Sequence, residues 1–296
     1  MTARFGRVST AMVTPFDEAG ELAVDAAVAL ARHLVSEGNE GLVVAGTTGE
    51  SATLTIDEKL TLFEAISSAV TVPVIAGTTG SNTRQDMGLT AEASKLGVAA
   101  ILVVAPYYSR PSQAGIEAHH RAIASVTDLP LMMYDIPKRT GRKVATDTLV
   151  KLANEVTNIV ALKDAAGDPS ETAKVIARSP GLEVYSGDSP MNLPLMSVGA
   201  VGVVGVCTHW AAPDHIQMLD AWAAGDIAAA QAHNRRLITS YEFEGNDDAP
   251  NPVQTKVMMQ TLGHQVGECR LPMGPAPAGT DVAARDVYER LVASRA

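Results

Sequence analysis

Short, mostly apolar runs alternate along the chain with longer segments of mixed polarity. Within the runs, apolar side chains occupy successive positions instead of alternate ones, which predicts strands that are buried on both faces, as in parallel sheets. Eight runs are present: Val8–Val13, Gly41–Ala45, Val72–Ala76, Ala99–Ala105, Leu129–Tyr134, Ile159–Lys163, Leu182–Ser186 and Val201–Val206.

The segments between the runs carry helix signals. Thr55 and Glu58 have the spacing of a capping box, and Leu60, Phe63 and Ile66 follow at helical intervals. A helix is therefore predicted to begin directly after Thr55.

Two other positions are expected to mark helix ends. Thr146 is predicted to cap a helix that contains Leu149, Leu152 and Val156. Gly97 stands where the end of a helix would require a positive φ.

Eight strand-then-helix units over about 220 residues predict a (β/α)8 TIM barrel. A doubly wound sheet is the alternative, but strands of similar length that are apolar on both faces favour closure. After Ala224 the strand pattern stops, and Ile227–Tyr241, Pro252–Leu262 and Val282–Leu291 are predicted helices. We therefore expect a catalytic barrel over residues 1–224 and a small helical C-terminal domain over residues 225–296.

Composition narrows the class of protein. The chain has 296 residues, 46% of them hydrophobic, and a formal net charge of −10. This length suffices for one large core, and the negative charge argues against nucleic acid or anionic membranes as partners. The two cysteines, Cys207 and Cys269, are too few and too far apart for a disulfide framework or a zinc site.

No targeting signal is recognisable. The first residues lack the apolar segment of a signal peptide, and the most apolar stretch, Val198–Cys207, is too short to cross a bilayer. A soluble, cytoplasmic protein is the expectation.

Lys163 is the most informative position in the chain. It ends a predicted buried strand, and none of the other seven lysines directly follows four apolar residues. Burial favours the neutral amine, which can attack a ketone and form a Schiff base. The alternative is a strand-end lysine whose ammonium group reaches water.

Polar residues follow the other predicted strands as well. Since the active site of a TIM barrel lies at the carboxyl ends of its strands, these residues are expected to meet there. The two threonines and the backbone N–H groups of the first such segment suit a carboxylate, and an arginine can bind an anionic substrate in an acidic protein. The segments are Gly46-Thr47-Thr48-Gly49-Glu50, Pro106-Tyr107-Tyr108, Tyr134–Gly141 and Ser186-Gly187-Asp188.

Other site types are not supported. Gly187 and Gly205 could flank a phosphate, but no glycine-rich loop with a lysine follows them. His209 is expected to be structural, because no spacing typical of metal ligands accompanies it. Neither a dinucleotide-binding fingerprint nor a nucleophile elbow occurs.

Together these motifs are characteristic. GTTGES at 46–51, YDIPKRTG at 134–141 and the strand-end Lys163 occur in one order, and the similarity extends from Ala11–Phe16 to Arg270–Met273. The chain resembles the dihydrodipicolinate synthase family, one of the Schiff-base aldolases that include N-acetylneuraminate lyase. Arg139, together with threonine rather than serine in GTTGE, favours the synthase over the sialic-acid lyase.

The resemblance implies a condensation of pyruvate with aspartate semialdehyde in lysine and diaminopimelate biosynthesis. It implies that Lys163 forms the Schiff base with pyruvate and that Tyr134 acts as general acid–base. Tyr134 would connect through Thr47 to Tyr108, which the neighbouring subunit contributes in this family.

The resemblance also implies the groups that bind the substrates. Thr48 would hold the pyruvate carboxylate, Arg139 the carboxylate of the semialdehyde, and Gly187 and Val204 would supply backbone carbonyls near the lysine. It implies no metal ion and no organic cofactor, and a homotetramer built as a dimer of dimers.

Several positions depart from the common family pattern and leave alternatives open. Asp135 replaces a frequent asparagine, Ser189 replaces a usual aspartate, and Gly205 replaces a common serine. The alternatives are another pyruvate-dependent lyase or dehydratase that acts on a keto-deoxy sugar acid, and a catalytically inactive paralogue that binds a keto acid.

A further departure concerns regulation. In lysine-inhibited members, the allosteric pocket uses histidines, an asparagine and a glutamate from the two helices after GTTGES. Here those places hold Ile56, Lys59, Ser81 and Gln85, so a lysine ligand would meet a like charge and lack its carboxylate partner. We predict that free lysine does not inhibit this protein.

Overall fold

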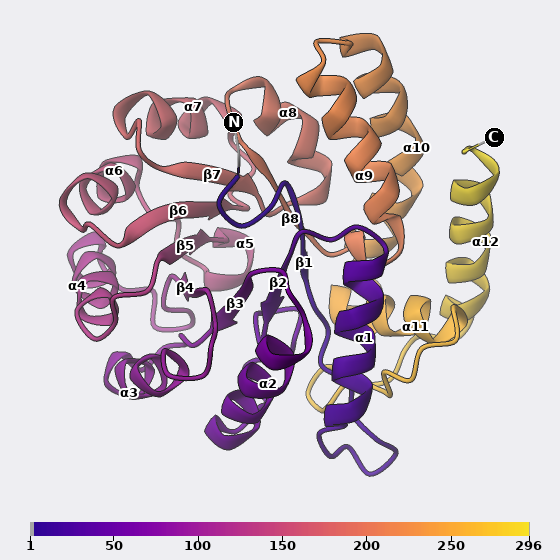
Figure 1. Ribbon diagram of the computed structural model, residues 1–296, viewed down its shortest axis with the longest axis horizontal. Helices are drawn as coiled ribbons and strands as arrows, with labels where there is room; N and C mark the ends of the chain where they lie inside the picture. Colours follow the sequence, from indigo (N-terminus) through magenta and orange to yellow (C-terminus); the bar gives the residue numbers. More distant parts are fainter. Residues whose placement is uncertain (1–2, 296) are drawn as a thin grey trace.

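A computed structural model describes residues 3–295 of the chain. Eight parallel strands pair in sequence order, and β8 pairs with β1 to close the barrel (Figure 1). Each predicted apolar run overlaps one strand, so the closed (β/α)8 barrel is confirmed and the doubly wound alternative is wrong. The strands are β1 Val8–Ala11, β2 Gly41–Val44, β3 Val74–Gly77, β4 Ala100–Val104, β5 Leu131–Asp135, β6 Ile159–Asp164, β7 Glu183–Ser186 and β8 Gly202–Gly205.

Helices surround the barrel, and the last three gather on one side of it (Figure 1). All three C-terminal helices predicted from the sequence are present as α10, α11 and α12, each with slightly different bounds. The helices are α1 Val24–Ser36, α2 Ile56–Ala69, α3 Thr83–Ala93, α4 Gln113–Ala124, α5 Pro137–Thr140, α6 Thr146–Glu155, α7 Pro169–Arg178, the 3-10 turn η1 Ser189–Met191, α8 Asn192–Ser197, α9 Thr208–Ala223, α10 Ile227–Gly245, α11 Asn251–Thr261 and α12 Thr280–Ala293.

Two of the three predicted helix ends are confirmed. The capping box is present, because the Thr55 hydroxyl accepts the Glu58 N–H at 3.2 Å and the Glu58 carboxylate accepts the Thr55 N–H at 2.7 Å. Gly97 has φ +77°, as expected. The prediction for Thr146 is wrong: Ala145 is the N-cap of α6, and the Thr146 hydroxyl instead donates to Glu171 of α7.

The inner face of the barrel explains where Lys163 points. Successive side chains of a strand alternate between its two faces, so Ala161 and Lys163 of β6 lie on the same face. Ala161 belongs to the buried cluster inside the barrel, together with Met132 and Tyr134 of β5. Lys163 therefore projects inward at the carboxyl end of β6, beside Tyr134.

The C-terminal helices pack on α9 through their own apolar cluster. It contains Trp210 of α9, Leu237 and Tyr241 of α10, Met258 of α11 and Leu291 of α12. This packing brings the carboxyl end of α10 and the start of α11 to the mouth of the barrel. Within residues 3–295, no helix is both long and apolar enough to cross a membrane.

Candidate active site

A cavity of about 390 Å³ opens at the carboxyl ends of the strands. It brings together six of the eight residues that the sequence singled out, from four different βα connections. They are Thr47, Thr48, Tyr134, Arg139, Lys163 and Gly187.

The other two predicted residues lie elsewhere. Val204 is buried in the cluster inside the barrel, and Val206 lines the cavity in its place. Tyr108 is 95% exposed and does not line the cavity. Its φ of +67° is unusual for a residue with a Cβ atom, so the backbone is held in a sparsely populated conformation there.

Lys163 is buried next to an aromatic ring. Only 3% of the residue is exposed, and Nζ lies 4.5 Å from the centre of the Tyr134 ring. Burial lowers the pKa of Lys163 from 10.5 to about 7, with Arg139 acting in the same direction and Glu244 opposing. A large fraction of the amine is therefore uncharged near neutral pH, as a nucleophile requires.

Gly187 leaves room for the lysine. A Cβ atom at Gly187 would lie 2.7 Å from Cγ of Lys163 and 2.8 Å from its Cε atom. Any larger residue would displace the lysine, which gives a packing reason for glycine after β7.

Tyr134 is held as a neutral phenol. Burial raises its pKa well above the usual value of 10, while Arg139 and a hydrogen bond with Thr47 act in the opposite direction. The phenol can therefore donate a proton to an atom beside Lys163, provided that another group replaces the proton.

The turn that carries Thr47 and Thr48 is anchored by a buried carboxylate. Glu50 pairs with Nζ of Lys256 in α11 at 2.8 Å and accepts the Arg270 N–H at 2.9 Å. Both side chains of the Glu50–Lys256 pair are almost fully buried, so the pair fixes the turn against the C-terminal helices.

Arg139 stands at the rim of the cavity on the short helix α5. Pro137 begins this helix, and Gly141 with φ +71° ends it. The Arg139 side chain donates from Nη2 to Oδ1 of Asn251 at 3.0 Å. Its guanidinium is thus directed over the cavity by a contact from α11.

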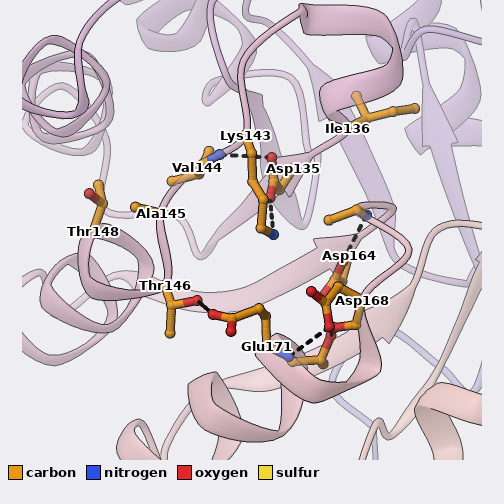
Figure 2. Close-up of polar contacts among 12 residues, drawn as sticks. Asp135, Ile136, Lys143, Val144, Ala145, Thr146, Thr148, Asp164, Asp168 and Glu171 are labelled. Atoms are coloured by element: carbon orange, nitrogen blue, oxygen red, sulfur yellow. Dashed lines mark hydrogen bonds and ion pairs between the residues drawn. The ribbon is translucent and has the colours of Figure 1, made fainter.

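Asp135 ties the segment after Arg139 back to β5 (Figure 2). Its Oδ1 accepts the Val144 N–H at 3.1 Å, and its Oδ2 lies 3.4 Å from Nζ of Lys143. Burial raises the pKa of Asp135 from 3.8 to about 6, and the neighbouring Asp164 adds to the rise. The carboxylate that replaces the frequent asparagine thus has a positioning role and does not line the cavity.

The histidine after β8 is structural. The Val13 N–H donates to Nε2 of His209, whose Nδ1 lies 2.7 Å from the Val206 carbonyl, and burial lowers the His209 pKa to about 4. Among residues 3–295, no group of three or more His, Cys, Asp or Glu side chains is arranged to hold a metal ion.

Sequence reasoning missed a part of the cavity wall that comes from the end of α10 and the segment leading into α11, residues 244–247 and 249–251. Glu244 of α10 and Asn251 of α11 both line the cavity, although they lie far along the chain from the strands. A signal for Glu244 was present: it follows Leu237 and Tyr241 at seven- and three-residue intervals, so a carboxylate occupies the buried face of a helix.

Comparisons with known proteins identify the family of the chain. Residues 4–287 match the model of the "Dihydrodipicolinate synthetase family". The chain is 44% identical to the 4-hydroxy-tetrahydrodipicolinate synthase of Bacillus subtilis, over 92% of this chain and 94% of that protein.

Solved structures of dihydrodipicolinate synthases are also similar to this chain. The crystal structure of a Bacillus anthracis dihydrodipicolinate synthase has a TM-score of 0.93 and 40% identity, covering 98% of this chain and 99% of that one. The Cyanidioschyzon merolae enzyme, solved with lysine bound, has a TM-score of 0.94 and 40% identity, covering 97% and 98%. The chain belongs to the dihydrodipicolinate synthetase family.

Proposed function

We propose that this protein is a 4-hydroxy-tetrahydrodipicolinate synthase, which condenses pyruvate with aspartate semialdehyde through a Schiff base on Lys163. The observation that carries the proposal is a buried lysine whose pKa falls to about 7 and whose Nζ lies 4.5 Å from the Tyr134 ring centre, inside the cavity. Family membership supplies the identity of the two substrates.

The chemistry follows from the amine. The uncharged Nζ of Lys163 attacks the ketone carbon of pyruvate, and addition of a proton with loss of water forms a protonated imine. The imine withdraws electrons, so the methyl carbon loses a proton to give an enamine. The enamine carbon bonds to the aldehyde carbon of the semialdehyde, and the aldehyde oxygen takes a proton. The substrate amine then attacks the imine carbon, closes the ring and releases the lysine.

Tyr134 and Thr47 are proposed to move the protons. The raised pKa of Tyr134 makes it a donor in the resting state, and a relay through Thr47 would return its proton. Tyr108 is too exposed to complete the relay within its own chain, so we propose that a second copy supplies it. A homotetramer made of two such pairs is the proposed assembly.

The remaining residues are proposed to bind the substrates. Thr48 and the N–H groups of its turn would hold the pyruvate carboxylate, and Arg139 the carboxylate of the semialdehyde. Gly187 and Val204 would contribute backbone carbonyls near Lys163.

The protonated imine supplies the electron sink, so we propose that the reaction needs neither a metal ion nor an organic cofactor. A cytoplasmic location is proposed with it, since both substrates belong to amino-acid metabolism. The division into a barrel over 1–224 and a C-terminal helical domain over 225–296 is likewise proposed.

A coupled assay tests the proposal. The pure protein is mixed with pyruvate, aspartate semialdehyde, dihydrodipicolinate reductase and NADPH, with Lys163→Ala in parallel. Loss of NADPH with the wild type alone is expected. If no loss occurs, trapping with borohydride in the presence of pyruvate separates the alternatives: a trapped adduct indicates a lyase or dehydratase for a keto-deoxy sugar acid, and none indicates an inactive paralogue.

A further inference from the structure

The carboxylate of Glu244 stands in the wall of the same cavity as Lys163. It comes from the last turn of α10, a helix outside the barrel, and 9% of the residue is exposed. A buried carboxylate is costly unless it is hydrogen-bonded or faces a cation, so its presence at this place requires a reason.

Two hydrogen bonds hold this carboxylate in place. Its Oε2 accepts the Ser189 hydroxyl at 2.9 Å and the backbone N–H of Cys207 at 2.8 Å. Both donors belong to segments that follow strands, β7 for Ser189 and β8 for Cys207. The barrel mouth therefore supplies donors for an acceptor that only the C-terminal helices deliver, and such donors stabilise the ionised form.

The charges around the cavity define what Glu244 faces. The cations that line this cavity are Lys163 of β6 and Lys138 and Arg139 of α5, and Asp188 after β7 and Asp247 after α10 are further carboxylates. Tyr134 of β5 is held neutral. Burial raises the pKa of Glu244, Asp188 adds to that rise, and the hydrogen bonds from Ser189 and Cys207 oppose it.

We propose that Glu244 is a positioning residue for the reaction, and that its carboxylate is the counter-charge to the protonated imine on Lys163. The inference rests on the proposed function, since it concerns the same Schiff base. A protonated imine carries a positive charge, and Lys163, on which it would form, is only 3% exposed. A negative charge in the wall stabilises this cation and the protonated lysine alike.

The charge of Glu244 affects the pH at which Lys163 becomes uncharged. Glu244 opposes the fall in the Lys163 pKa that burial causes. Removal of its charge is therefore expected to lower the pKa of Lys163 further. The free amine would then form at lower pH, while the imine would lose a stabilising neighbour.

The test measures the initial rate of adduct formation with subsaturating pyruvate, trapped by cyanoborohydride and counted by mass spectrometry, as a function of pH. The wild-type rate is expected to fall on the acid side, with a midpoint near the Lys163 pKa of about 7. Glu244→Gln keeps the shape and the acceptor oxygen but removes the charge, and is expected to lower this midpoint by roughly one pH unit. Its maximal turnover is expected to fall at least tenfold.

Glu244→Asp separates charge from shape, because it keeps the charge and shortens the side chain. The proposal expects Asp to move the midpoint less than Gln does, whereas a purely structural role predicts the reverse order. Glu242→Gln, on the same helix but exposed, is the matched control and is expected to behave as wild type.

The outcomes separate a failure of the proposed function from a failure of the role of Glu244. A wild type that traps no pyruvate overturns the proposed function itself. A wild type that traps pyruvate, with an unmoved midpoint in folded Glu244→Gln, overturns only the role of Glu244. If Glu244→Gln does not fold, the smaller neutral variant Glu244→Ala is compared with wild type in its place, and an unmoved midpoint is again the contradicting result.

Discussion

Arg139 and Asn251 are 112 positions apart in sequence, yet Nη2 of the arginine donates to Oδ1 of the asparagine at 3.0 Å. The arginine belongs to the helix after β5, and the asparagine is the first residue of α11. Because Asn251 is uncharged, it orients the guanidinium without neutralising it. The barrel thus supplies the cation, and the C-terminal helices determine its direction.

Loss of this hydrogen bond should weaken binding of one substrate only. Asn251→Ala is expected to raise the KM for aspartate semialdehyde by roughly three- to tenfold, the effect of one hydrogen bond to a charged group at an exposed site. The KM for pyruvate should stay the same, because Lys163 and Thr48, not Arg139, are proposed to hold pyruvate. Initial velocities with each substrate varied in turn measure the effect. Asn154→Ala, an exposed asparagine of α6, is the control, and equal changes in both KM values would contradict the assignment.

Replacement of the lysine should abolish activity and stabilise the fold. The folded-state pKa of Lys163 is about 7 against 10.5 for the free side chain, so the unfolded chain binds more protons between these values and wild-type stability rises with pH there. Lys163→Met should therefore be more stable than wild type at pH 7, by about 2–4 kcal/mol, with a gap that narrows towards pH 10. Urea unfolding at several pH values measures the gap, and a gap independent of pH would count against a desolvated lysine.

The raised pKa of Asp135 has the opposite effect on the pH dependence of stability. Its folded-state pKa is raised from 3.8 to about 6, so the folded protein binds more protons in this window and wild-type stability falls as pH rises through it. The stability of Asp135→Asn relative to wild type should therefore increase by about 1–3 kcal/mol between pH 4 and pH 7. Unfolding of both proteins at these two pH values tests this, since shifts of other groups cancel in the difference. A constant difference would contradict it.

Tyr108 should matter for turnover and not for pyruvate binding. Tyr108→Phe is expected to lower turnover at least tenfold, as loss of a proton-relay group does, while trapping of pyruvate continues. Unchanged turnover would make the relay assignment wrong.

A mixing experiment tests whether Tyr108 acts in a neighbouring copy. Lys163→Ala and Tyr108→Phe proteins are unfolded together and refolded. A mixed assembly would contain sites with an intact lysine and a tyrosine from the other copy, so activity should exceed that of either variant alone. Activity no greater than the sum of the separately refolded variants would exclude a contribution between copies.

Free lysine should not inhibit the enzyme. Lys59 and Gln85 stand where the resemblance places groups that bind the lysine ligand, and burial lowers the pKa of Lys59. Even with a lowered pKa, its amine offers no acceptor for a cationic ligand while it remains protonated. The coupled assay with added lysine measures this. Half-inhibition at a lysine concentration below 1 mM would contradict the prediction.

Much of the site follows from local pattern. A strand buried on both faces is a continuous apolar run, so the eight strands and their ends could be read from the chain. Strand alternation then puts Lys163 and Tyr134 on the inner face, and closure of the barrel brings Thr47 and Gly187 to them. The prediction that Thr146 caps a helix was wrong, because its hydroxyl donates to Glu171 of the next helix and Ala145 occupies the N-cap position.

The sequence by itself thus determined the barrel and the family, and it predicted the buried lysine that we propose as the nucleophile. Only the tertiary structure decided that Glu244 and Asn251 reach the cavity and that Tyr108 does not. The reason is physical: strand order and alternation are local and periodic, and they fix which strand ends meet. The position of α10 and α11 depends instead on how their apolar faces pack on α9, a contact between distant segments that no single stretch of sequence encodes.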